Sequence, residues 1–321
     1  MNSFSHLNSR AQKKLKSKFI NGEAIVSKPA KAILTSSNDL GVALNGGRIG
    51  SLYGPKAIMN QLGNLIAPKD IEKVHVFESI NSDKNYSYEE FNQMQEDQID
   101  FYNDLFKRLE FPEKLIHLGS GHDQIYPLLS SIGHIQKPKW KRVVLINLDA
   151  HLDTRTDSHF HSGTPFRQWF HERKKSQAVK IPTIFYQVGI NSYANDSSNY
   201  ENYPNQDENF ESKILPINEI DPNNYQSEKN TVLHNLLNSL NKDDLLYISL
   251  DCDALCSYQF QAVSAPNHEG LTLEWLSELL EAANNKSLAN QIFGLYEYNP
   301  KYDDLSCHNA RNLTPLILKM L

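Results

Sequence analysis

The stretch that most constrains the fold of this chain runs from residue 143 to residue 155. Val143–Leu148 is an unbroken apolar run of the kind that forms a β-strand, and it stops at Asp149-Ala-His151-Leu-Asp153-Thr-Arg155. Alternate side chains of an extended chain face the same side, so we expect Asp149, His151 and Asp153 to project together. Open α/β sheets place their ligands at the carboxyl ends of the strands. The run therefore predicts a strand that delivers a polar site at that edge of a sheet.

Two further apolar runs also end in polar groups. Asp251 and Asp253 follow Leu245–Leu250, and Gly-Ser-Gly-His122 follows Leu115–Leu118. Neighbouring buried carboxylates repel each other unless a cation neutralises them or one of them holds a proton. Oxygen and imidazole donors without a thiolate suit a hard divalent cation such as Mn²⁺. The candidate metal ligands are His122, Asp149, His151, Asp153, Asp251 and Asp253.

The strand candidates recur along most of the chain. Eight of them begin at Ala32, Val74, Leu115, Val143, Thr183, Ile214, Leu245 and Ile292. Most are separated by segments that are compatible with helices, and this alternation predicts an α/β fold with a parallel sheet covered on both faces. We expect one domain, residues 31–321, preceded by a polar and basic N-terminal extension, residues 1–30, to which no function is assigned.

Composition narrows the classes of partner. The net charge is −6 and no basic field covers the whole chain, which argues against nucleic acid. The three cysteines form neither a zinc-ribbon nor a CxxC spacing, and their odd number argues against a disulfide framework. No apolar run approaches the length of a membrane span, and no secretory h-region follows Met1. We therefore expect a cytoplasmic protein without a membrane partner.

Three polar residues outside these clusters are candidates for binding a substrate. Arg48 lies in a glycine-rich loop, residues 41–54, that lacks the Walker spacing of a phosphate loop. Its planar fork could grip a carboxylate, although an ordinary surface arginine is an equal alternative. Asn191 follows the strand that begins at Thr183 and is taken as a second candidate. Glu297 follows the last strand and could bind a cationic group.

Six motifs follow one another along the chain: Asn45-Gly-Gly-Arg48, Gly-Ser-Gly-His122-Asp, Asp149-Ala-His-Leu-Asp153, Ser162-Gly-Thr-Pro165, Asp251-Cys-Asp253 and Glu297-Tyr-Asn-Pro. In this order they resemble the motifs of the arginase (ureohydrolase) superfamily over roughly residues 30–321. Within the superfamily the chain is most similar to the formimidoylglutamase branch. The Asn-x-Gly-Arg loop, the order Gly-x-Gly-His-Asp and a serine at Ser162, where arginases carry a histidine, favour that branch.

The resemblance implies a three-layer αβα fold with an eight-stranded parallel sheet and two Mn²⁺ ions per chain. One ion would be held by His122, Asp149, Asp153 and Asp251, and the second by His151 and Asp253, with Asp149 and Asp251 bridging both. The reaction that the resemblance implies is the hydrolysis of an amidine. The expected substrate is N-formimidoyl-L-glutamate, which is converted with water to L-glutamate and formamide in histidine degradation. Asp153 and Glu297 would be catalytic. Arg155 would hold a substrate carboxylate, with Arg48 or Arg167 as helpers, and relatives commonly form trimers or hexamers.

Several alternatives remain open at this point. Another ureohydrolase, acting on a guanidino acid, agmatine or arginine, has a similar motif set. A zinc deacetylase on a similar sheet or a non-catalytic, metal-stabilised binding protein is a more distant alternative. The segment Ala254–Ala262 departs from the family pattern and is expected to border the site. Either His159 or His161 could replace the proton-shuttle histidine of arginases.

Overall fold

The computed structural model describes residues 13–22, 29–71, 73–79, 87–135, 138–175, 181–203 and 206–321. Nine strands in these ranges form one sheet in the order β1-β3-β2-β4-β9-β8-β5-β6-β7, and every neighbouring pair is parallel. The strands are β1 (Phe19–Asn21), β2 (Lys31–Thr35), β3 (Val74–Glu78), β4 (Lys114–Leu118), β5 (Arg142–Leu148), β6 (Thr183–Ile190), β7 (Phe210–Pro216), β8 (Asp244–Asp251) and β9 (Asn290–Tyr296). The α/β fold class is confirmed, but the expected count of eight strands is wrong.

The ninth strand lies within residues 1–30, which the sequence assigned to an N-terminal extension. Phe19–Asn21 pairs with Val74–Val76 of β3 at one edge of the sheet. Just before it, Leu15 in a short 3₁₀ helix is fully buried in the main hydrophobic core. Few apolar residues mark this segment among its lysines, so a three-residue edge strand gave no periodic signal.

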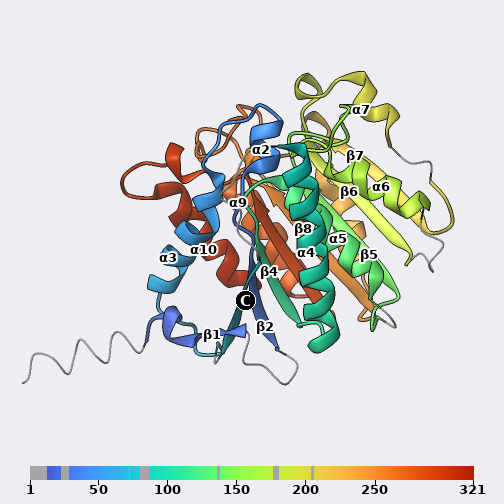
Figure 1. Ribbon diagram of the computed structural model, residues 1–321. Coiled ribbons are helices and arrows are strands. Elements are labelled where there is room, and N and C mark those ends of the chain that lie inside the picture. The colour runs from blue at the N-terminus through green and yellow to red at the C-terminus, as the bar shows by residue number, and fades with distance from the viewer. Residues whose placement is uncertain are drawn as a thin grey trace, which may run out of the picture.

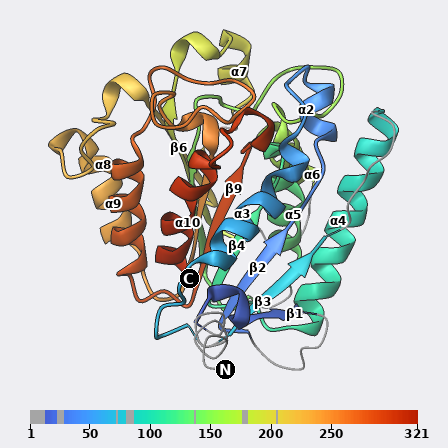
Figure 2. The ribbon, with the colours of Figure 1, turned by 90° about the vertical axis from the view of Figure 1, so that its left-hand side faces the viewer.

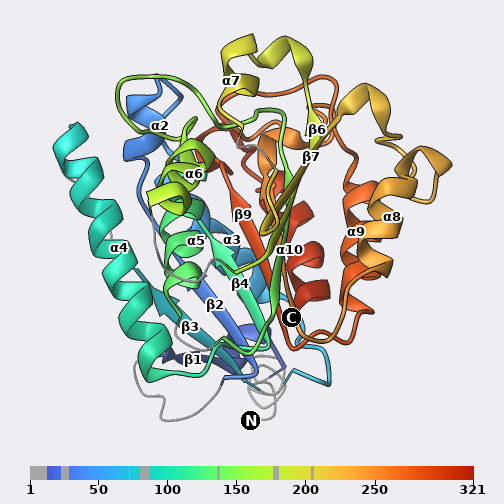
Figure 3. The ribbon, with the colours of Figure 1, turned by 90° about the vertical axis from the view of Figure 1, so that its right-hand side faces the viewer.

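Helices cover both faces of the sheet, as Figures 1, 2 and 3 show from three sides. The helices of the described residues are α2 (Leu40–Leu44), α3 (Gly54–Asn64), α4 (Tyr88–Arg108), α5 (Ile125–His134), α6 (Pro165–Lys175), α7 (Ser197–Glu201), α8 (Thr231–Asn238), α9 (Leu273–Asn284) and α10 (His308–Met320). One layer contains α4, α5 and α6, and the other contains α3, α8, α9 and α10 (Figures 2 and 3). None of these helices is both long and apolar enough for a membrane crossing.

Local sequence explains why the central elements form. β8 is buried at all eight positions and β5 at all but its first, which is why both read as nearly continuous apolar runs. The longest helix, α4, begins after Ser87, whose hydroxyl accepts from the backbone N–H of Glu90 at 3.1 Å. A serine followed three residues later by glutamate is the sequence of a capping box.

The order of the central strands places the polar motifs side by side. β4, β9, β8 and β5 are consecutive neighbours, and the polar motifs follow these four strands. Parallel strands have their carboxyl ends at the same edge of a sheet. His122, Asp149 and Glu297, which follow their strands, and Asp251, which ends β8, therefore meet at one place.

Candidate metal centre

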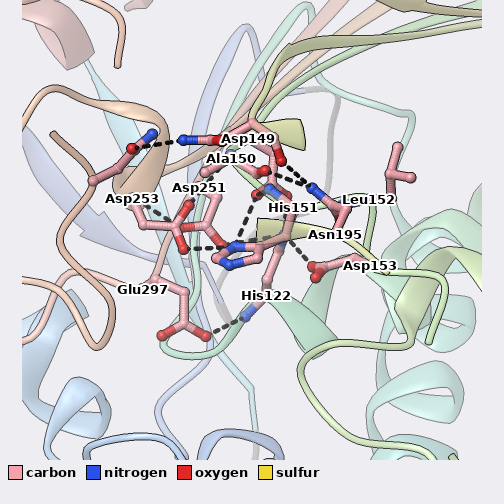
Figure 4. Close-up of polar contacts among 12 residues, drawn as sticks. His122, Asp149, Ala150, His151, Leu152, Asp153, Asn195, Asp251, Asp253 and Glu297 are labelled. Atoms are coloured by element: carbon pink, nitrogen blue, oxygen red, sulfur yellow. Dashed lines mark hydrogen bonds and ion pairs between the residues drawn. The ribbon is translucent and has the colours of Figure 1, made fainter. Parts of the chain in front are cut away.

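The structure brings all six predicted metal ligands together at the carboxyl edge of the central strands (Figure 4). One group consists of His122, Asp149, Asp153 and Asp251, and a second of Asp149, His151 and Asp253. In each group one donor atom per residue lies within 4.8 Å of all the others. Asp149 belongs to both groups, as the resemblance implied, whereas Asp251 falls only in the first.

The route by which these side chains meet differs from the expected alternation along a strand. β5 already ends at Leu148, so Asp149 to Asp153 form a loop, and Asp153 has a φ of 53°. Asp253 lies in a 3₁₀ helix, Cys252–Ala254. The prediction that period-two geometry gathers the ligands is therefore wrong, and the turns after the strands gather them.

His122 is the centre of the first group and is almost fully buried. Its Nδ1 lies 3.0 Å from an oxygen of Asp149, 2.8 Å from Asp153 and 3.3 Å from Asp251. Its Nε2 lies 3.1 Å from the hydroxyl of Ser249. Burial by itself disfavours the imidazolium, but the three carboxyl groups close to Nδ1 outweigh it and raise the pKa of His122 well above 6.5.

In the second group, too, neighbouring carboxylates outweigh the effect of burial on the pKa of the histidine. The Nδ1 of His151 lies 3.0 Å from an oxygen of Asp253. Burial disfavours the charged imidazole, yet the negative charge of Asp253 prevails and raises the pKa of His151 to about 10. Burial and the neighbouring charge of Asp153 raise the pKa of Asp149 to about 7.

These donors fit a pair of divalent cations. Four aspartates lie within two overlapping groups, and all four are buried. Crowded carboxylates are stable together only when positive charge neutralises them or protons remain bound. Imidazole nitrogens and carboxylate oxygens are ligands that Mn²⁺ accepts. His122, Asp149, Asp153 and Asp251 could hold one ion, and Asp149, His151 and Asp253 a second.

Glu297 lies beside the first group, directly after β9. Its carboxylate accepts from the backbone N–H of His122 at 3.1 Å, and its own N–H donates to the carbonyl of Ser120 at 2.7 Å. Its φ of 63° lies in the left-handed region, which non-glycine residues rarely adopt. Burial, together with the charges of Asp253 and Asp123, raises the pKa of Glu297 to about 8.

A cavity of about 260 Å³ opens above these groups. It is lined by Val42, Asn45, Gly46, Gly47, Arg48, His151, Asp153, Arg155, Ser162, Asp251, Asp253, Ser264, Ala265 and Glu297. Arg48 and Arg155, which were both predicted to bind substrate, line this cavity, but their guanidinium groups have different hydrogen-bond partners. Arg155 donates through Nη1 to the side-chain oxygen of Asn45 at 2.7 Å. Arg48 donates to the backbone carbonyls of Val263 and Ser264, and its guanidinium lies 3.9 Å from the centre of the Tyr302 ring.

Two other predicted parts of the site lie outside the wall of this cavity. Asn191 is not among the residues that line the cavity, because its side chain accepts from the N–H of Tyr193 and donates to Asn267. The segment Ala254–Ala262 does not line it either. The segment packs into the core through Leu255 and Phe260, and it borders the site, because the cavity-lining residues Asp253 and Ser264 stand directly before it and two residues after it.

The histidines of the loop after the cluster also lie outside the cavity wall. His159 stacks on Tyr88 with ring centres 3.9 Å apart. His161 is buried, with Nε2 lying 2.9 Å from Asp157 and Nδ1 accepting from the N–H of Gly163. Both ring nitrogens of His161 are thus engaged in holding the loop. Arg167, which was considered as a helper in binding the substrate, donates to the carbonyl of Asp157 in the same loop.

Two residues that hold the site in place were not identified from the sequence. Asn195 accepts from the N–H of Leu152 at 2.8 Å and donates to the carbonyl of Ala150 at 3.0 Å, which fixes the loop that carries the ligands (Figure 4). Ser249 contacts His122 from the body of β8. Neither belongs to a motif, so only the folded contacts reveal them.

Comparison with known proteins identifies the family. The model of the arginase family matches residues 40–321. The formimidoylglutamase of Hahella chejuensis is 30% identical over 268 residues, which cover 83% of this chain and 76% of that protein. The formimidoylglutamase of Photorhabdus laumondii is 29% identical over 272 residues, which cover 85% and 79%. The chain belongs to the arginase family, and the expected enzyme class, a hydrolase, is confirmed.

Solved structures agree on the fold. The formimidoylglutamase of Bacillus subtilis has a TM-score of 0.73 at 16% identity, with 96% of this chain and 90% of that chain covered. A variant of Trypanosoma cruzi formiminoglutamase, crystallised with Mn²⁺, has a TM-score of 0.70 at 21% identity and covers 96% of both chains. At these identities the likeness establishes the arginase fold.

Proposed function

We propose that the protein is a binuclear manganese hydrolase that converts N-formimidoyl-L-glutamate and water to L-glutamate and formamide. One observation carries the proposal. Glu297 and the guanidinium of Arg155 line the same cavity, and Glu297 lies outside the six residues that would bind metal, so a ligand there meets both a carboxyl group and a positive charge. A cationic amidine joined to a carboxylate matches that pattern. The formimidoylglutamases among its sequence relatives support the same substrate class.

The six clustered side chains would hold the two metal ions. Two Mn²⁺ ions held there would neutralise the carboxylates, act as Lewis acids and lower the pKa of water enough for attack at neutral pH. In the reaction, a C–O bond forms at the amidine carbon and its bond to the glutamyl nitrogen breaks. The protein must therefore orient the amidine carbon and deliver a proton to the departing nitrogen.

Glu297 and Asp153 are the residues assigned to these two tasks. Glu297 has one oxygen fixed by the backbone of His122, so its other oxygen can pair with an amidine nitrogen and hold the carbon in place. Asp153 lines the cavity and contacts His122. We assign Asp153 the transfer of a proton from the attacking water to the glutamyl nitrogen.

Arg155 is the carboxylate-binding residue in this proposal. Among the described residues, its guanidinium is engaged only through Nη1 by Asn45, which leaves further N–H groups of the planar fork for a carboxylate. Arg48 is a less suitable partner, because two of its donors already hold the carbonyls of residues 263 and 264. A guanidino acid offers the same pair of charges as formimidoylglutamate and is the second candidate substrate. We further propose a cytoplasmic homo-oligomer, a trimer or a hexamer, which sedimentation can test.

A parallel substrate screen tests the function. Protein loaded with Mn²⁺ is assayed for formamide release from N-formimidoyl-L-glutamate and for urea release from arginine, agmatine and guanidino acids. The metal content of the same sample is counted. We expect two Mn²⁺ per chain and formamide as the product. Urea from a guanidino acid would assign the chain to another branch of the family, and two bound metals without any turnover would favour a binding protein.

A further inference from the structure

Asn45 joins two cavity-lining side chains from a distant part of the sequence. Arg155 and Ser162 lie 110 and 117 residues away from it, and all three residues line the cavity. We propose that Asn45 is a positioning residue that makes Arg155 and Ser162 one carboxylate-binding cradle, so that the enzyme selects amidines that carry a carboxylate. This inference rests on the proposed amidine hydrolase and adds the residue that sets its selectivity.

The contacts of Asn45 fix the orientation of its amide. Arg155 donates from Nη1 to Asn45 Oδ1 at 2.7 Å, and Asn45 Nδ2 donates to the Oγ of Ser162 at 3.0 Å. A guanidinium can only donate, so the amide oxygen must face Arg155 and the amide nitrogen must face Ser162. One side chain therefore orients both partners at the same time.

This arrangement leaves donors available on both partners. The hydroxyl of Ser162 accepts from Asn45, and no acceptor for its own proton is found in the part of the chain that the structure describes, so it can donate into the cavity that Ser162 lines. In the described part of the chain, no acidic side chain forms an ion pair with Arg155, so its positive charge is available to a ligand. A guanidinium beside a hydroxyl donor suits a carboxylate, which accepts at two oxygens.

The backbone holds Asn45 firmly in its place. Asn45 ends α2, and its N–H is directed at the carbonyls of Gly41 and Ala43. Gly163 leaves room for both side chains. A Cβ at this position would lie 3.1 Å from Cδ of Arg155 and 3.3 Å from Nδ2 of Asn45. The absence of a side chain at Gly163 thus allows the arginine to lie close to the loop.

The cradle predicts which amidines are rejected. With a substrate that lacks a carboxylate, the guanidinium of Arg155 would have no anion to bind in the cavity. The complex would then lack a charge-assisted hydrogen bond. Glu297 would still pair with the amidine end of that substrate. Selectivity for a carboxylate should therefore appear in KM for the carboxylate substrate and should depend on Asn45.

The test compares Asn45→Ala with a matched control. Asn285→Ala makes the same change at another helix C-cap: Asn285 ends α9, is exposed, and directs its N–H at the carbonyls of Glu281 and Ala283. KM is measured on Mn²⁺-loaded protein with N-formimidoyl-L-glutamate and with N-butylformamidine, which has no carboxylate. Binding of L-glutamate is measured by calorimetry on the same samples. Metal content and thermal stability show whether each variant is folded and loaded.

We expect Asn45→Ala to raise KM for formimidoylglutamate and Kd for glutamate on the order of ten- to hundredfold. Metal content and any turnover of N-butylformamidine should stay as in the wild type, and Asn285→Ala should change nothing. Asn45→Asp should be at least as damaging, because an aspartate would neutralise Arg155 and could not donate to Ser162. Unchanged KM and Kd in Asn45→Ala, or a wild-type protein that binds no carboxylate, would overturn the inference. Glutamate binding that depends on Asn45 without formamide release would instead refute only the proposed substrate.

Discussion

Replacing Ser249 with alanine should weaken metal binding without any change to a metal ligand. In the wild type the Ser249 hydroxyl lies 3.1 Å from Nε2 of His122, and both side chains are buried. When Nε2–H donates to that hydroxyl, the lone pair of Nδ1 faces Asp149, Asp153 and Asp251, where the first ion would lie. The alanine variant removes the acceptor. Metal binding requires an imidazole whose proton lies on Nε2, and the hydroxyl of Ser249 stabilises that form. Without this acceptor, the form with a proton on Nδ1, which faces three carboxylates, is favoured, and metal binding weakens.

The size of this effect follows from comparable sites. Loss of an outer partner of a metal-binding histidine typically lowers metal affinity by about ten- to hundredfold. That range corresponds to about 1.4 to 2.7 kcal/mol of binding free energy. Because Ser249 does not contact the cavity in this structure, the change should appear in metal affinity, and at saturating Mn²⁺ the KM for substrate should stay the same.

A competition titration against a chelator measures this affinity directly. Ser131→Ala is the matched control, since Ser131 is also fully buried and donates to the carbonyl of Ile99 on α4, away from the cluster. It should lower thermal stability to a comparable degree and leave metal affinity unchanged. Equal metal affinities of Ser249→Ala and the wild type would refute the tautomer argument.

Three further predictions concern the charges of the site. Asp251→Asn should lose at least one Mn²⁺ per chain together with activity, because it removes a ligand charge next to His122; retention of two ions by elemental analysis would exclude Asp251 as a ligand. Arg155→Ala should raise KM for a carboxylate substrate by about tenfold or more with the metal content intact, and an unchanged KM would exclude Arg155 from substrate binding. Stabilisation by metal should grow with pH. Burial first, and then the charge of Asp153, raise the pKa of Asp149 from 3.8 to about 7, so the metal-free fold keeps a proton that the unfolded chain releases between these values. The stability of the metal-free protein should therefore fall as pH rises through that window. The gain in Tm on adding Mn²⁺ should be larger at pH 8 than at pH 5.5, and a gain that shrinks with pH would contradict this account.

The sequence predicted the fold class and the histidines and aspartates that cluster at the carboxyl edge because both depend on strong local signals. Strands buried on both faces, such as β5 and β8, appear as apolar runs, and the acids after them mark the carboxyl edge. The edge strand β1 was missed because three residues at the border of the sheet carry no periodic pattern. The short helices α2 and α7 were missed as well, since five residues are too few for a helical stripe.

The sequence could not predict how the ligands meet or what supports them. In the loop after β5, the backbone of Asp153 adopts the left-handed conformation. The side chains that were expected to cluster do cluster, but this turn brings them together, and not the alternation of side chains along a strand. The bonds of Ser249 and Asn195 depend on pairs that are 127 and 43 residues apart in the chain, and a single sequence carries no sign of such pairs. Arg48 shows the opposite case, because its motif was visible although its fork turned out to hold backbone carbonyls.

The strained backbone of the two proposed catalytic residues connects the fold to the reaction. Asp153 and Glu297 have φ values of 53° and 63°, conformations that cost about 1 to 2 kcal/mol for a residue with a side chain. Glycine would relieve that cost but would remove the carboxylate. The strain persists because neighbouring bonds hold both residues: Glu297 is fixed through Ser120 and the backbone of His122, and the N–H of Phe166 donates to the carbonyl of Asp153. These bonds come from the loop after β4 and from the start of α6, outside the segments that carry the two carboxylates. These bonds therefore keep both carboxyl groups oriented before a substrate arrives, which is the preorganisation that the proposed hydrolysis requires.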